Sequence, residues 1–146
     1  MNIWIINHFA NSPLRGSSTR HFALARRLSC KGHRVTIIAG SHDHVIGAKT
    51  DPFEGGHLCT TESQIPYVWV RSSSERSSLG RISAMFSFGY RLLRVPGSAF
   101  SERPDVIVGS SPHPFAALAA LRLARRYNVP FVLEVRDLWP DSLTEL

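Results

Sequence analysis

The sequence predicts an α/β fold, a Rossmann-like doubly wound parallel sheet in a single domain. Short apolar segments rich in β-branched residues alternate along the chain with stretches of helical periodicity. The apolar segments also end abruptly in polar or charged residues, most clearly where the run 131–135 gives way to Arg136 and Asp137. This order is typical of right-handed crossovers between parallel strands, whose carboxyl ends carry the ligands.

Five strands are expected from the apolar runs. They cover residues 1–7, 34–39, 67–71, 106–108 and 131–135. Residues 41–64 are rich in Gly, His, Asp and Ser and show no sustained period. A stretch of this kind within a compact domain predicts a small hairpin or a mobile flap.

Three helices are expected between these strands. The first covers residues 20–31, because Phe22, Ala25 and Leu28 recur at helical spacing. Thr19 stands where a threonine can cap the start of this helix. The other two helices are expected over residues 81–94 and 114–127, the last beginning at a proline.

Composition narrows the function classes. The net charge of +6 comes almost entirely from arginine, since only Lys31 and Lys49 are lysines. Arginine binds phosphate and carboxylate. The possible partners are therefore nucleic acid, anionic lipid headgroups or a phosphorylated ligand. No nucleic-acid-binding motif is present, and we expect no nucleic-acid partner. Cys30 and Cys59 are expected to be free thiols in a reducing compartment such as the cytoplasm.

No signal peptide or apolar run long enough to span a bilayer is visible in the sequence. The helix over residues 81–94 nevertheless combines apolar and aromatic residues with arginines. We expect Ile82, Met85 and Leu93 to pack in the core. For Phe88 and the arginines, a core helix with a solvated basic face and an interfacial helix on an anionic membrane both stay open.

The sequence of the loop after the first strand distinguishes between the classes of nucleotide-binding fold. A dinucleotide-binding domain would have three glycines there, and a P-loop would end in Gly-Lys-Ser/Thr. Residues 8–19 contain one glycine, and no P-loop occurs in the chain. The loop therefore disfavours a nicotinamide-dependent oxidoreductase. Gly16 and Ser17, just before a helix, remain candidates for cradling a phosphate or a sugar hydroxyl.

Further candidates follow the later strands. Ser110, Ser111 and His113 follow the fourth strand in a proline-rich turn and can hydrogen-bond a polyol, and His113 can transfer protons. Arg136 and Asp137 follow the last strand. The pair of histidines in His42-Asp43-His44 lacks an obvious third ligand, so no metal is predicted.

Three stretches resemble family 4 of the retaining glycosyltransferases. Residues 16–39 (GSSTRHFALARRLSCKGHRVTIIA) resemble the start of that family, and residues 104–115 (PDVIVGSSPHPF) resemble its fourth strand and turn. Residues 135–142 (VRDLWPDS) resemble a branch that transfers fucosamine-type sugars in O-antigen and capsule synthesis. Two departures are a single glycine in the first loop and Arg136 where many members have histidine.

The resemblance implies a GT-B fold, in which two Rossmann-like domains face each other across a cleft. Residues 1–146 would be an incomplete N-terminal, acceptor-side domain, with the C-terminal donor domain absent, and would not be a competent enzyme alone. Transfer would retain the anomeric configuration and need no metal or other cofactor. Implied catalytic residues are Arg136, Asp137 and His113, and implied substrate-binding residues are Gly16, Ser17, Thr19, Arg20 and Ser111.

The implied function is transfer of a sugar from a nucleotide-sugar to a saccharide or polyprenyl-diphosphate-linked acceptor in surface polysaccharide biosynthesis. It would take place in the cytoplasm, at the inner face of the membrane. Two alternatives stay open. One is a non-catalytic binding subunit of a split glycosyltransferase, and the other is an NAD(P)-dependent oxidoreductase domain.

Overall fold

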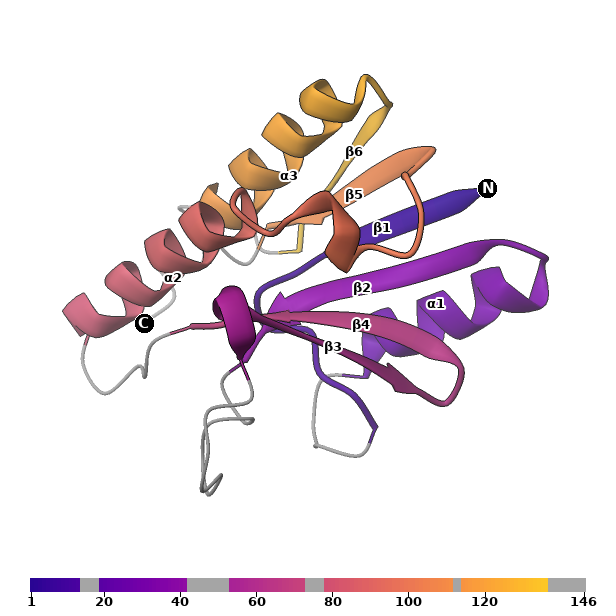
Figure 1. Cartoon of the computed structure of the whole chain (residues 1–146), viewed down its shortest axis with the longest axis horizontal. Coiled ribbons are helices and arrows are strands. Elements are labelled where there is room, and N and C mark those ends of the chain that lie inside the picture. Colours follow the sequence, from indigo (N-terminus) through magenta and orange to yellow (C-terminus); the bar gives the residue numbers. More distant parts are fainter. Residues whose placement is uncertain (14–18, 42–52, 73–77, 112–113, 137–146) are drawn as a thin grey trace.

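The computed structural model describes residues 1–13, 19–41, 53–72, 78–111 and 114–136. These residues form a six-stranded sheet with α1 on one face and α2 and α3 on the other (Figure 1). The strands, in spatial order, are β3 (His57–Glu62), β4 (Ile65–Val70), β2 (Arg34–Gly40), β1 (Asn2–Ile6), β5 (Val106–Ser110) and β6 (Phe131–Glu134). The helices are α1 (Arg20–Cys30), α2 (Ser78–Leu92) and α3 (Pro114–Tyr127), with short 3-10 turns η1 (Glu54–Gly56) and η2 (Gly97–Ala99). The predicted α/β, Rossmann-like class is confirmed.

The five expected strands all run in the same direction. β1 pairs with β2 and β5, β2 pairs with β4, and β5 pairs with β6, each in parallel. The register keeps the strand ends together, since Ile6 faces both Ile38 and Gly109, and Ser110 faces Glu134. The residues that follow β1, β2, β4, β5 and β6 therefore meet along one edge of the sheet, here called the carboxyl rim.

The expectation of five strands is incomplete. A sixth strand, β3, pairs antiparallel with β4, so the region 41–64 includes the small hairpin that its composition allowed. The hairpin turn uses Ser63 and Gln64, both with positive φ values of 48° and 70°. Turns of this kind are usually read from Asn-Gly or Asp-Gly, so the sequence carries no turn signal here. The flap interpretation of residues 42–52 lies outside the described residues.

Alternate side chains of β1 enter two separate cores. Ile3 and Ile5 pack with Phe22 and Ala25 on the face covered by α1. Trp4 and Ile6 pack with residues of α2 and α3 on the other face, including Phe88, Leu92, Ala120 and Leu123. Both faces of the central strands are therefore apolar, as expected for a parallel sheet covered on both sides.

Helix α2 has two apolar stripes on opposite sides. Ala84, Phe88 and Leu92 are buried against the sheet, while Ile82, Phe86 and Tyr90 are exposed, the first two with 57% and 58% of their surface open. The expectation that Ile82 packs in the core is thus wrong, whereas Phe88 is a core residue. Residues two positions apart on a helix, such as Ile82 and Ala84, point in directions about 200° apart. The two stripes therefore lie on opposite sides of α2, and packing one against the sheet leaves the other outside.

Candidate functional site

Buried polar residues gather at the carboxyl rim. They come from different strand ends and from the start of α1: Asn7, His8, His21, Ser41, Ser72 and Ser110. Burying polar groups is unfavourable unless they are hydrogen-bonded, so a cluster of them at one edge of a sheet indicates a site rather than a packing core.

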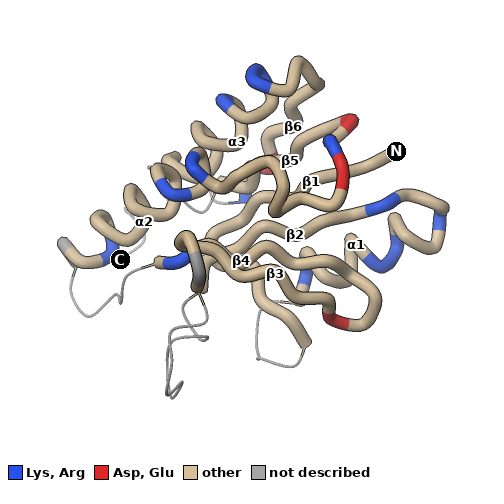
Figure 2. Tube along the Cα trace, in the orientation of Figure 1, with Lys and Arg blue, Asp and Glu red and all other residues tan. Residues whose placement is uncertain are grey.

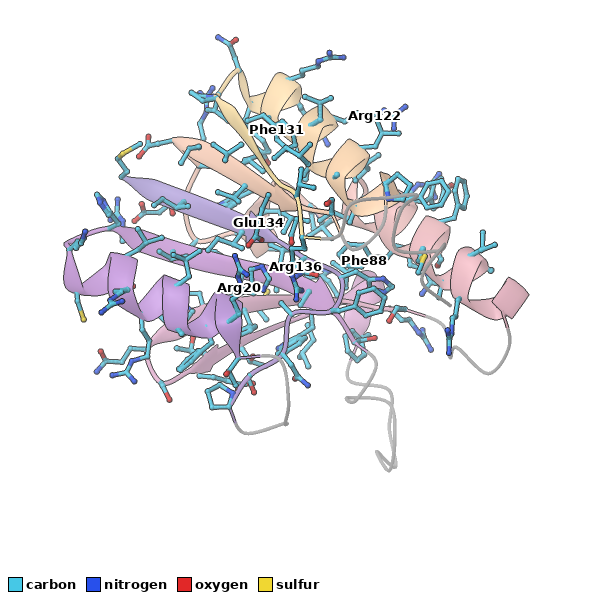
Figure 3. All side chains as sticks on the ribbon, turned by 180° about the vertical axis from the view of Figure 1, so that it is seen from behind. Arg20, Phe88, Arg122, Phe131, Glu134 and Arg136 are labelled. Atoms are coloured by element: carbon cyan, nitrogen blue, oxygen red, sulfur yellow. The ribbon has the colours of Figure 1, made fainter. Side chains whose placement is uncertain are left out.

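Glu134, the last residue of β6, is the centre of this cluster. Its Oε1 lies 2.9 Å from the guanidinium of Arg20, and its Oε2 lies 2.9 Å from Nε2 of His21. The hydroxyl of Ser110 also donates a hydrogen bond to it. The carboxylate is 17% exposed, and the ring of His21 is fully buried. Arg20 and Glu134 lie close together at the carboxyl rim, with Arg136 near them in the same region (Figure 3).

The hydrogen bonds of Asn7 fix the direction of this network. The backbone N–H of Phe9 donates to Oδ1 of Asn7 at 2.9 Å, so the Asn7 amide must turn its NH2 group the other way. This NH2 group lies 3.2 Å from Nδ1 and 3.3 Å from Nε2 of His21, and 3.4 Å from Oγ of Ser110. Because an ionised carboxylate can only accept, Nε2 of His21 donates to Glu134. The Asn7 NH2 group thus lies behind His21 and Ser110, and these two residues donate to the Glu134 carboxylate.

Glu134 is held as a carboxylate by this environment. Its partial burial is the largest single influence and opposes ionisation, but the hydrogen bonds from His21 and Ser110 and the nearby positive charge of Arg20 together outweigh it. The pKa of Glu134 therefore lies below the ordinary glutamate value. A carboxylate saturated with donors is suited to holding a cation in place rather than to supplying a proton.

The turns after β5 and β6 are joined through Ser111. The backbone N–H of Ser111 donates to the carbonyl of Glu134 at 2.9 Å, and its Oγ accepts from the backbone N–H of Arg136 at 3.4 Å. The Arg136 side chain is exposed. The two bonds hold Arg136 at the same rim as Arg20.

Four residues that the sequence nominated are thus brought to the carboxyl rim: Arg20, Ser110, Ser111 and Arg136. Thr19 precedes α1 at the N-cap position, but its side chain makes no capping hydrogen bond to the described helix. Gly16, Ser17, His113 and Asp137 lie outside the described residues, and their roles stay predictions.

Sequence reasoning missed Asn7, His21 and Glu134, whereas Ser110 was a candidate for binding a polyol. One signal was available, because Glu134 is a charged residue inside an otherwise apolar run. His21 gave none, since it lies in an amphipathic helix pattern.

His8 is buried at the carboxyl rim, where it contacts both β2 and α2. Its buried ring stacks on Phe88, with centroids 4.4 Å apart, and its carbonyl accepts from the N–H of Gly40 at 2.9 Å. A Cβ on Gly40 would lie 2.4 Å from Cδ2 and 2.9 Å from the carbonyl oxygen of His8. Only glycine fits at this position without displacing the ring or the backbone.

Gly40→Ala is therefore expected to lower the free energy of unfolding by about 2 kcal/mol, the usual effect of overpacking a close contact. Urea denaturation followed by circular dichroism measures the change. Gly97→Ala is the matched control, because a Cβ there would meet the hydroxyl of Tyr127 at an ordinary 3.6 Å. Equal stability of the two variants would contradict the close packing of His8.

A hollow of about 350 Å³ lies near the amino ends of β1 and β2. Its lining includes the ion pair of Arg34 and Glu102, in which the Arg34 side chain is largely open to solvent and the Glu102 side chain partly so. Exposed pairs of this kind contribute little and hold no fixed geometry. The carboxyl rim, with its buried network, is the better candidate site.

The described part of the chain contains neither a metal-type cluster of side chains nor a helix that could cross a bilayer. No group of three or more His, Cys, Asp or Glu side chains there could hold a metal ion. Within the same residues, none of the helices has the length and apolar character that crossing a bilayer requires. His42, Asp43 and His44 lie outside them. Cys30 and Cys59 are both free thiols.

The sheet order and the polar carboxyl rim define a Rossmann-like α/β domain of the kind that forms the N-terminal half of GT-B enzymes. Comparison with protein families gives the particular family. The model of the glycosyl transferase 4-like domain matches residues 15–145. The chain therefore belongs to the family of glycosyl transferase 4-like domains. No curated protein matches the chain significantly.

Proposed function

We propose that this chain is the acceptor-side domain of a retaining glycosyltransferase that moves a sugar from a nucleotide-sugar to a saccharide or polyprenyl-diphosphate-linked acceptor. The pathway we propose is surface polysaccharide biosynthesis, in the fucosamine-transferase branch. The observation that carries the proposal is the carboxyl rim, where Glu134 fixes Arg20 beside Arg136 in a chain of this family. The nucleotide-sugar would be held mainly by a second, donor domain.

In the proposed reaction the bond between the anomeric carbon and the diphosphate oxygen breaks, and a bond to the acceptor hydroxyl oxygen forms. Negative charge grows on the departing diphosphate, and its oxygen takes up the proton that the acceptor hydroxyl loses. Fixed cations stabilise such charge best when they are already in position. Arg20 and Arg136 are the two cations at the rim that we assign to acceptor binding and charge stabilisation. Asp137 and His113 are proposed to lie near the transferred sugar.

Joining the chain to an intact donor domain of the same family allows a transfer assay with radiolabelled nucleotide-sugars. Arg136→Ala is expected to reduce transfer by about a hundredfold, the usual effect of removing one charge-stabilising group. Arg34→Ala is the control, because Arg34 lies at the amino end of β2. Transfer by the Arg136→Ala protein at the unsubstituted rate would remove Arg136 from the site. Transfer by the chain alone would contradict its role as half of an enzyme.

The location proposed for the reaction is the cytoplasmic face of an anionic membrane. Support comes from the outer surface of α2 and α3, where Ile82, Phe86, Tyr90 and Leu118 are exposed. The rings of Phe86 and Phe115 meet edge to face at 5.7 Å, which joins the two helices in one apolar patch. Basic residues lie along the helices (Figure 2), and Arg122 projects from α3 away from the sheet (Figure 3).

Arg94 stacks on Tyr90 with its guanidinium carbon 4.2 Å from the ring centroid, at the end of the apolar patch. Apolar side chains bordered by arginines suit the boundary between lipid headgroups and acyl chains. A lipid-linked acceptor would be reached from such a position.

Co-sedimentation with vesicles is expected to show stronger binding to phosphatidylglycerol-containing membranes than to pure phosphatidylcholine. Phe86→Ser and Arg94→Gln should each weaken this binding about fivefold, because each removes about 1 kcal/mol of apolar or electrostatic attraction. Leu24→Ser and Arg26→Gln on α1 are the matched controls, since both positions are exposed on the other face of the sheet. Equal losses in all four variants would contradict docking through α2 and α3.

A further inference from the structure

We propose that Arg20 is the receptor for a phosphate or diphosphate group of the acceptor, and that Glu134, His21 and Asn7 are positioning residues that hold its guanidinium in place. This inference rests on the proposed function, because it names the part of the substrate that the carboxyl rim recognises. It is carried by the chain of hydrogen bonds that ends on Arg20.

The guanidinium of Arg20 has more N–H donors than its ion pair with Glu134 uses. One terminal nitrogen bonds Oε1 of Glu134, while the side chain as a whole is 66% exposed. A guanidinium carries five N–H donors in a planar fork, which matches the oxygens of a phosphate group. Within the part of the chain that the structure describes, the donors not used by Glu134 therefore remain available at the rim.

The carboxylate that holds Arg20 is itself held from behind. Glu134 accepts from His21 and Ser110, and both of these contact the NH2 group of Asn7. His21, Ser110 and Asn7 are fully buried, so their positions are set by the fold and not by solvent. An ordinary surface arginine loses side-chain entropy when it binds an anion. Arg20 has lost part of this freedom already.

The ion pair at the other end of the sheet has a carboxylate that is more open to solvent than that of Glu134. Arg34 pairs with Glu102, and the Glu102 side chain is 39% exposed against 17% for Glu134. The two pairs have the same chemistry but differ in what lies behind the carboxylate. Arg34 and Glu102 therefore provide a matched control within the same chain.

The charges at the rim favour an anion. Among the described residues there, Arg20, Arg71 and Arg136 contribute three positive charges and Glu134 one negative charge, and the first turn of α1 carries no acidic side chain. A diphosphate with more than one negative charge can be shared between Arg20 and Arg136, whereas an uncharged saccharide would use neither charge. The inference thus favours acceptors that carry a phosphate or diphosphate over neutral sugars.

Binding of inorganic pyrophosphate to the chain, measured by isothermal titration calorimetry at low ionic strength, tests the inference. Arg20→Gln is expected to weaken binding about tenfold, the effect of losing a charge-assisted hydrogen bond. Arg20→Lys should recover only part of this loss, because an ammonium lacks the fork. Arg34→Gln removes the same charge at the other end of the sheet and should change binding less than twofold.

Glu134→Gln separates positioning from simple electrostatics. The substitution removes a negative charge beside Arg20, so plain attraction of an anion to positive charge predicts tighter binding. Positioning predicts the reverse, a loss of about fivefold to tenfold, because the guanidinium is released. Glu102→Gln should have no such effect. Unchanged or tighter binding by the folded Glu134→Gln protein would overturn the inference, and so would unchanged binding by Arg20→Gln, whose exposed side chain is not needed for folding.

The transfer assay keeps this inference distinct from the proposed function. Pyrophosphate binding that follows the predicted order, together with no transfer to any acceptor, would reject the glycosyltransferase proposal and leave the anion site standing. Equal transfer by the unsubstituted and Arg20→Gln proteins to diphosphate-linked acceptors would reject the assignment of Arg20 while the enzyme proposal stands.

Discussion

Glu134→Ala is expected to lower the free energy of unfolding by about 3 kcal/mol at pH 7, because it leaves a buried His21 N–H without its acceptor and frees Arg20 from its ion pair. Urea denaturation followed by circular dichroism measures this change. Glu102→Ala, which removes the exposed partner of Arg34, should lower stability by no more than about 0.5 kcal/mol.

The effect of Glu134→Ala should also depend on pH in a definite direction. Because the folded-state pKa of Glu134 is lowered, its ionised form stabilises the fold at every pH above the ordinary glutamate pKa of about 4.3. This contribution is lost as the pH falls from there through the lowered folded-state pKa. The difference between the two proteins should therefore be constant from pH 7 to about pH 5 and narrow below that. A difference that grows on acidification would contradict the direction of the pKa shift.

Trp4→Ala is expected to have the largest effect on stability, a loss of about 4 kcal/mol in the free energy of unfolding. Trp4 is almost fully buried at the centre of β1. Its ring stacks on Phe100 with centroids 4.0 Å apart and meets the edge of Tyr127 at 5.2 Å. Alanine would leave a cavity under α3 that these aromatic neighbours cannot fill.

Phe86→Ala is the matched control for Trp4→Ala, since it also replaces an aromatic residue with alanine but at an exposed position of α2. Its loss of stability should stay below about 1 kcal/mol, because only the contact with neighbouring rings is removed. Circular dichroism is the suitable probe for both proteins, because removing a tryptophan changes the fluorescence itself. Similar losses for the two variants would mean that Trp4 is not a core residue.

Most of the fold could be predicted because its signal is local. The apolar runs that became β1, β2, β4, β5 and β6 were each recognisable within a few residues, and all five run in parallel. β3 was expected only as one of two alternatives for residues 41–64 and could not be placed, because Thr60, Thr61 and Glu62 lack an apolar alternation and its turn residues have no usual turn composition. The exposed Ile82 shows a second limit, since α2 has two apolar stripes and its sequence does not say which one meets the sheet.

The exposed residues of the candidate site could be predicted from the sequence, but most of the buried residues behind them could not. Arg20, Ser111 and Arg136 stood out because they follow strand ends or begin a helix, and all three lie at the carboxyl rim. Most of the buried residues behind them have no such signal. Asn7 and His21 are ordinary polar residues in the sequence and gain meaning only from their contacts, whereas Ser110 was a candidate because it ends the fourth strand.

The sequence by itself determined the alternation of strands and helices, and through it a parallel sheet whose polar turns share one edge. It did so because hydrophobic periodicity and strand propensity act over neighbouring residues. Only the tertiary structure decided which polar groups become partners: His21 meets Glu134 across 113 positions of sequence, and Asn7 meets Ser110 across 103. Those pairings follow from the order β2-β1-β5-β6 in the sheet, which places distant strand ends within hydrogen-bonding distance.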